Sequence, residues 1–154
     1  MRRLLLVVLA ACLAAGLAFS VSLFAVPKAS QASDSGDVVW VARRYIGTDY
    51  GWDSCTKRHM NCSCLTKKVF AKFGYDLPWW DDMQWKVGRR VSRSELRPGD
   101  LVFFQEYGPK GGITHVGIYS GHGYLIHASE YYDEVVETEM KYIRGYKGAR
   151  RLRV

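Results

Sequence analysis

The sequence lacks the features that mark several common protein classes. It has no arginine-rich tract and no basic helix with a recognisable base-reading motif, although 22 Lys and Arg residues outnumber 15 Asp and Glu residues. It also lacks internal repeats and low-complexity tracts. These absences argue against a nucleic-acid-binding protein. The remaining mild excess of positive charge suits an anionic surface such as a bacterial cell wall.

The chain has only one long apolar run, at its N-terminus. Arg2 and Arg3 precede apolar residues 4–26, and Ser30-Gln31-Ala32 places small residues at the −3 and −1 positions of a cleavage site. This pattern predicts a secretory signal over residues 1–32. An uncleaved membrane anchor is an alternative, since about 20 apolar residues span a bilayer, and the segment before Cys12 also resembles a lipoprotein box. Each alternative predicts a secreted or cell-envelope protein that meets the membrane only through this segment.

Cleavage would leave one domain and little else. Residues 33–154 comprise 122 residues, enough for a single hydrophobic core. They carry 19 basic and 15 acidic residues, a net charge of +4. We interpret residues 33–36 as a short polar spacer and residues 37–154 as the domain, which we expect to be a monomer.

Cysteine is scarce, and its spacing is not that of a metal site. Beyond residue 32 the cysteines are Cys55, Cys62 and Cys64. The pattern C-x6-C-x-C lacks the C-x2–4-C pairs of structural zinc sites, so we expect no metal and no cofactor. An odd number of cysteines in an oxidising compartment indicates one disulfide and one free thiol. We expect Cys55 to pair with Cys64, leaving Cys62 free; three free thiols are the alternative.

Helical patterns come first along the domain and strand patterns follow. Apolar spacing predicts helices over residues 37–46 and from Cys62 to Phe73, and a short one over 81–87. Bulky or alternating runs then predict strands over residues 101–104, 114–119, 123–128, 134–138 and 146–151. A glycine-rich loop is expected over residues 107–112. This order predicts an α+β domain with N-terminal helices packed on an antiparallel sheet.

Cys62 is the candidate nucleophile because of its position in the second helix. Asn61 is a favourable N-cap, so Cys62 falls in the first turn. There the free backbone N–H groups and the helix dipole favour a thiolate, the reactive form of cysteine. A small buried apolar cysteine would fit the same position, and a base nearby is needed to decide between the two.

Two histidines in one predicted hairpin supply that base. A three-residue turn over residues 120–122 would place His115 directly opposite His127, with both side chains on one face of the sheet. A two-residue turn would put them on opposite faces. Gly123 suits the left-handed position that follows a three-residue turn, so we predict the odd-length turn. His115 would then serve as base to Cys62, with His127 as the third, orienting group.

Five motifs together resemble the NlpC-type cysteine peptidases of bacterial cell walls. They are Tyr50-x-Trp52, Asn61-Cys62-Ser63, the run from Leu96 to Phe104, the strand from His115 to Tyr119, and Ile126-His127-Ala128. The resemblance runs from about residue 38 to residue 151. It implies a papain-like fold and cleavage of peptidoglycan stem peptides, typically between D-γ-glutamyl and a diamino acid.

The resemblance also implies residue roles. Cys62 matches the nucleophile, His115 the base and His127 the orienting group. Tyr50 matches a tyrosine near the oxyanion and Ser63 a residue lining the substrate groove. Asn61 stands where the family usually has aspartate, which keeps the capping oxygen but weakens any preference for a substrate ammonium.

Two other functions are compatible with these residues. A wall-binding module could hold stem peptides without cutting them, although it would not need a base beside a thiol. An amidase or acyltransferase could use the same scaffold and the same three residues.

Overall fold

A computed structural model describes residues 32–107 and 112–154. The predicted signal or anchor, apart from Ala32, and most of the predicted glycine-rich loop lie outside these residues. In the described part of the chain, no helix combines the length and apolar character needed to cross a membrane.

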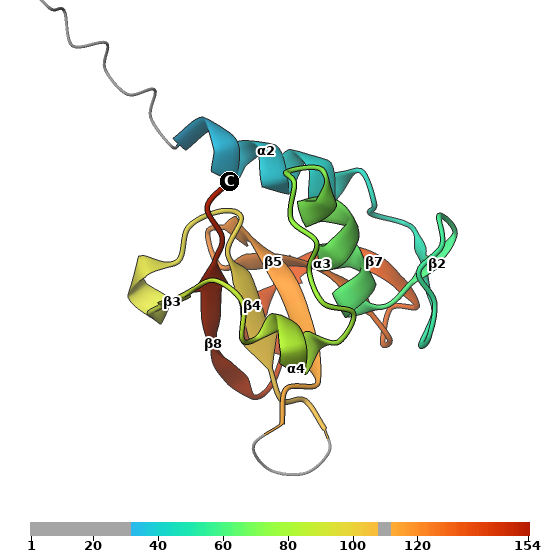
Figure 1. The fold of residues 1–154 in the computed structure, drawn as a ribbon. Coiled ribbons are helices and arrows are strands. Elements are labelled where there is room, and N and C mark those ends of the chain that lie inside the picture. The colour runs from blue at the N-terminus through green and yellow to red at the C-terminus, as the bar shows by residue number, and fades with distance from the viewer. Residues whose placement is uncertain (1–31, 108–111) are drawn as a thin grey trace, which may run out of the picture.

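Two helices pack together on one side of a curled sheet (Figure 1). The first, α2, spans Ala32–Arg43. It begins five residues before the predicted start and ends three residues before the predicted end. Turns continue from Arg43 to Gly47, where a φ of +82° ends the helical path. The second, α3, spans Cys62–Ala71 and crosses β5, as Figure 1 shows. The predicted arrangement of N-terminal helices on a sheet is confirmed.

The start and the buried face of α3 are those that the sequence predicts. The Asn61 side chain accepts a hydrogen bond from the Cys64 backbone N–H, closing the first turn. Leu65, Val69 and Phe70 are fully buried against the sheet. The helix ends at Ala71, slightly before the predicted end.

The third helix, α4, is shorter than predicted and covers only Asp81–Gln84. Gln84 is fully buried, and its side-chain amide donates to the carbonyls of Ser63 and Pro78. The Thr66 hydroxyl donates to its amide oxygen. Gln84 therefore fastens α4 to the first turns of α3, directly below Cys62.

Within the described residues, eight strands form one sheet in the order β2-β1-β7-β6-β5-β4-β8-β3. All pairings are antiparallel except that of β1 with β2. The five predicted strands are present as β4 (Leu101–Phe104), β5 (His115–Gly121), β6 (Tyr124–Ser129), β7 (Glu134–Glu139) and β8 (Tyr146–Arg151). The sequence did not predict β1 (Asp49–Tyr50), β2 (His59–Met60) and β3 (Arg89–Val91), because runs of two or three residues show no alternation.

The predicted register of the β5–β6 hairpin is wrong by two residues. Ile118 pairs with Ile126, so His115 lies diagonal to His127 rather than opposite it. The turn contains two residues, His122 and Gly123, whose positive φ values of 51° and 83° fit a type I′ turn. A β-bulge at Ser120 adds one residue to β5. A two-residue turn alone would put the two histidines on opposite faces of the sheet. The extra residue in the bulge reverses this, so both histidines still share one face.

Candidate active site

Cys62 is the first residue of α3, and its neighbour Asn61 fixes the backbone on both sides. The Asn61 amide oxygen accepts from the Cys64 backbone N–H at 2.8 Å and from the Ser63 hydroxyl at 3.2 Å. Its amide nitrogen donates to the Trp52 carbonyl at 3.0 Å. Asn61 thus ties the preceding loop to the helix start. No charge from this position faces a ligand, because the side chain is a neutral amide and is buried.

Cys55 and Cys64 form a disulfide, and Cys62 is a free thiol. The bridged Cα atoms are 5.4 Å apart, and the bond ties the loop before α3 to the first turn of the helix. The Cys64 side chain is buried in the core. The pairing is the one expected from the sequence.

The two histidines lie in direct contact. His115 Nε2 is 2.8 Å from His127 Nδ1, and the rings are nearly perpendicular, at 87°. His127 Nε2 is 3.0 Å from the Thr138 hydroxyl on β7. Thr138 could not be identified from the sequence, because it comes near His127 only through the β6–β7 register, which pairs His127 with Val136. The result is a chain of hydrogen-bonding groups that ends at His115.

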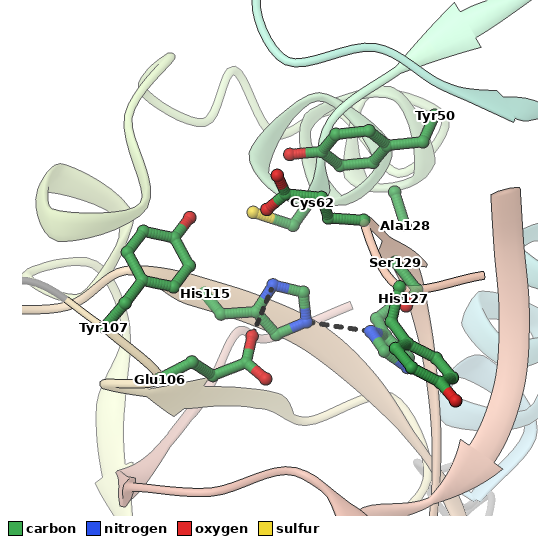
Figure 2. Close-up of a pocket in the computed structure, with 10 residues that line it drawn as sticks. Tyr50, Cys62, Glu106, Tyr107, His115, His127, Ala128 and Ser129 are labelled. Atoms are coloured by element: carbon green, nitrogen blue, oxygen red, sulfur yellow. Dashed lines mark hydrogen bonds and ion pairs between the residues drawn. The ribbon is translucent and has the colours of Figure 1, made fainter. Parts of the chain in front are cut away.

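The free thiol and the histidine pair line one cavity of about 290 Å³. In Figure 2 the Cys62 sulfur lies in the same cavity as the His115 ring, on the side of the ring that carries Nδ1. The hydroxyl groups of Tyr50 and Tyr107 point into the same cavity. The structure thus brings together Cys62, His115, His127 and Tyr50, all four of them singled out in the sequence; we call this space the Cys62 cavity.

The resting charge state differs from the sequence expectation. Burial, reinforced by the carboxylate of Asp81, raises the pKa of the Cys62 thiol to about 12, and hydrogen bonds from the Val116 and Ser63 backbone offset this only in part. Burial and the neighbouring His127 lower the pKa of His115 well below its usual value. The helix dipole was expected to favour the thiolate, but burial has the larger and opposite effect on the pKa of Cys62, because desolvation disfavours the charged form. The resting pair is a neutral thiol and a neutral imidazole.

Two carboxylates in this cavity were not found from the sequence. Glu106 Oε2 is 3.6 Å from His115 Nδ1, on the opposite side of the ring from His127 (Figure 2). Glu130 lines the same cavity. Burial, together with the charge of Glu130, raises the pKa of Glu106. The only available sequence signal is that Glu106 closely follows the buried β4 strand.

A second cavity, of about 190 Å³, lies on the other side of the thiol. It shares Tyr50, Cys62 and Tyr107 with the first, so the thiol lies between two hollows. Trp52 and Trp80 form its exposed aromatic walls. Ser63 also borders it, although its buried hydroxyl donates to Asn61.

A cysteine at a helix start, facing a histidine from an antiparallel sheet, defines the papain-like class of cysteine peptidase folds. The sequence comparison narrows this class. Residues 47–150 match the NlpC/P60 family, and the chain belongs to that family. The expected family and fold are confirmed.

Known relatives share the domain but are mostly longer. The chain is 44% identical over 89 residues to "Probable endopeptidase p60" of Listeria innocua, covering 58% of this chain and 18% of the relative. It is 32% identical over 104 residues to the gamma-D-glutamyl-L-lysine dipeptidyl-peptidase of Bacillus subtilis, covering 68% and 35%. A solved NlpC/P60 family protein from Bacillus cereus superimposes with a TM-score of 0.72 at 28% identity, covering 78% and 40%. The chain thus spans less than a fifth of the Listeria relative.

Proposed function

We propose that the protein is a peptidoglycan endopeptidase that hydrolyses stem peptides at the bond between D-γ-glutamyl and a diamino acid. The observation that carries the proposal is the single cavity in which a free thiol faces a histidine pair. The name of the Bacillus subtilis relative supports the choice of bond. This function and the predicted signal or anchor both support a location outside the cytoplasmic membrane.

The first chemical step is a proton transfer within the neutral pair. For His115 to accept the thiol proton at Nδ1, its Nε2–H must donate to His127 Nδ1. The Nε2–H of His127 then donates to the Thr138 hydroxyl. The Cys62 thiolate formed in this way attacks the scissile carbonyl. His115, now an imidazolium, protonates the leaving amine, and water hydrolyses the acyl-enzyme.

The negative charge of the intermediate needs donors close to the thiol. Backbone N–H groups at the start of α3 and the Tyr50 hydroxyl lie beside Cys62. Burial and the Cys62 charge raise the pKa of Tyr50, so the hydroxyl keeps its proton and donates. One such donor typically contributes about 2.7–4 kcal/mol to transition-state stabilisation.

Mass analysis of muropeptides after digestion tests the bond. Cleavage between D-glutamyl and the diamino acid is the expected result. Release of the intact stem from its sugar would identify an amidase, and new amide products would identify an acyltransferase. Either result would overturn the proposed bond while leaving the nucleophile in place.

Labelling by iodoacetamide at neutral pH tests the nucleophile separately. We expect stoichiometric alkylation of Cys62 that is lost in His115→Ala, because the base activates the thiol. A Cys62 that stays inert under reducing conditions, together with uncut stem peptides that still bind, would instead identify a binding module.

A further inference from the structure

A second group of charged residues lies at the β3 edge of the sheet, near the Trp85 ring. Arg90 on β3 pairs directly with Arg150 on β8. Like charges in directly opposed positions of an antiparallel pair destabilise it. In the described part of the chain neither guanidinium forms an ion pair, and the Nε of Arg150 is buried without a hydrogen-bond partner. The fold thus retains an unfavourable pair of charges at this edge.

Aromatic rings hold these arginines in fixed positions. Arg150 and Arg90 lie 4.2 Å and 5.7 Å from the centroid of the Trp85 ring. Arg93 lies 4.9 Å from the ring centroid of Tyr146. Stacking uses the faces of the guanidinium groups and leaves the N–H donors at their edges available. Such donors are oriented before a ligand arrives.

These residues surround a hollow of about 280 Å³, which we call the Trp85 cavity. Trp85, Arg90, Arg93, Tyr146 and Lys147 supply its side-chain walls. Arg150 stands beside it across the strand pair. None of the residues in this cavity lines the Cys62 cavity.

The nearby carboxylates are already engaged. Asp100 accepts two hydrogen bonds from Arg151, at 2.6 and 2.7 Å. Glu95 accepts from the Ser92 hydroxyl at 2.6 Å. Among the residues that the structure describes, Arg90, Arg93, Lys147 and Arg150 form no ion pair with an acidic side chain.

We propose that the Trp85 cavity binds phosphate esters, as found in anionic polymers of poly(glycerol phosphate) type. Arg90, Arg93 and Lys147 all line this hollow, and a phosphate group offers several acceptor oxygens in a compact tetrahedron. A bound phosphate would also relieve the repulsion between Arg90 and Arg150. Binding there leaves the Cys62 cavity open, so the site would hold the domain on a polyanion without blocking turnover.

The test measures binding of poly(glycerol phosphate) and of inorganic phosphate by the full chain at fixed ionic strength. We expect the double variant Arg90→Gln/Arg93→Gln to bind the polymer about tenfold more weakly. The matched control is a double variant with Arg44→Gln and Lys68→Gln, which removes the same charge elsewhere; Arg44 also stacks on a tryptophan, at 5.0 Å. This control should change the affinity by less than about twofold. Phosphate should raise the melting temperature of the wild type more than that of the Arg90→Gln/Arg93→Gln variant.

Three results would overturn the proposal. The first is absence of polymer binding by the wild type. The second is an equal loss of affinity in both double variants. The third is an Arg90→Gln/Arg93→Gln variant that binds the polymer normally but aggregates. The second would mean general attraction by net charge, and the third would mean that the arginines only protect an edge strand. Hydrolysis of a short stem peptide measures the proposed peptidase activity and should be unchanged in both double variants. Failure of one proposal can therefore be distinguished from failure of the other.

Discussion

The Cys62 cavity and the Trp85 cavity handle charge in opposite ways. In the first, burial suppresses charge on the thiol and on both imidazoles, and each imidazole has a polar partner. In the second, Arg90 and Arg93 line the cavity without an ion pair to any acidic residue in the described ranges. A site for proton transfer thus keeps its groups neutral until a substrate arrives. A site for binding alone can carry permanent charge at the surface, at some cost in stability.

The largest expected effect is the difference in hydrolytic activity between a variant of the Cys62 cavity and a variant of the Trp85 cavity. Cys62→Ser should lower kcat for stem-peptide hydrolysis by about 10³-fold or more, because a hydroxyl is a poorer nucleophile beside the same base. Arg90→Gln should leave hydrolysis of a short stem peptide unchanged. Circular dichroism should show both variants folded, since Cys62 is outside the disulfide. Substantial turnover by Cys62→Ser would show that the nucleophile lies elsewhere.

The second prediction concerns how acid changes the stability of the protein through the buried histidines of the Cys62 cavity. Burial lowers the pKa of His127 to about 4, whereas the unfolded chain binds this proton near pH 6.5. The unfolded state therefore gains a proton first, and stability is lost as the pH falls from 6.5 to 4. His127 alone should remove about 3 kcal/mol of unfolding free energy over this range.

Urea denaturation at a series of pH values measures this loss. His127→Gln lacks the titration, so its unfolding free energy should fall less steeply between pH 6.5 and 4. His115, with a pKa also lowered by burial, contributes in the same direction and remains in the variant. A wild type whose stability is flat across this interval would show that the histidines are not buried in neutral form.

The sequence predicts the Cys62 cavity far better than the Trp85 cavity. Asn61 as N-cap, the helix that follows and the strands around both histidines all depend on local patterns, and all are present. The position of both rings on one face of the sheet was also predicted, although it was attributed to a three-residue turn. The bulge at Ser120, followed by Gly121 with a φ of +106°, was not predicted.

Residues that reach a site through pairing between distant strands could not be predicted. Thr138 and Glu106 reach the histidines from β7 and from the end of β4. Arg90 meets Arg150 only because a three-residue strand, β3, pairs with β8. The raised pKa of the resting thiol was missed as well, because desolvation depends on the complete fold rather than on the helix start.

The third prediction concerns the orientation of the base. His127→Ala should lower kcat by about 10²-fold with little change in KM, because His115 loses the acceptor that keeps its proton on Nε2. His127→Asn should recover part of this loss, since its amide oxygen can accept the same hydrogen bond. Steady-state kinetics on a stem peptide measure both variants. Equal activity of the alanine and asparagine variants would rule out a role in orientation.

The smallest expected effect concerns a charged contact in the Cys62 cavity, the one between Glu106 and His115. Glu106 faces His115 Nδ1 at 3.6 Å, where the imidazolium proton will reside after transfer from Cys62. An ionised Glu106 stabilises that imidazolium, so Glu106→Gln should lower the pKa of His115 further and make proton transfer less favourable. We expect kcat to fall about three- to tenfold, because the carboxylate is partly exposed and its charge is screened.

The pH profile of kcat/KM distinguishes this role from a structural one. The acidic limb reports protonation of His115 in the free enzyme, and in Glu106→Gln it should move to lower pH. Glu130→Gln removes the same charge from the same cavity without a contact to His115, so its acidic limb should move less. Tyr107, Cys62 and His127 also face this region and are unchanged in both variants. Identical shifts in the two variants would mean that the summed charge of the cavity, rather than the Glu106–His115 contact, sets the pKa of the base.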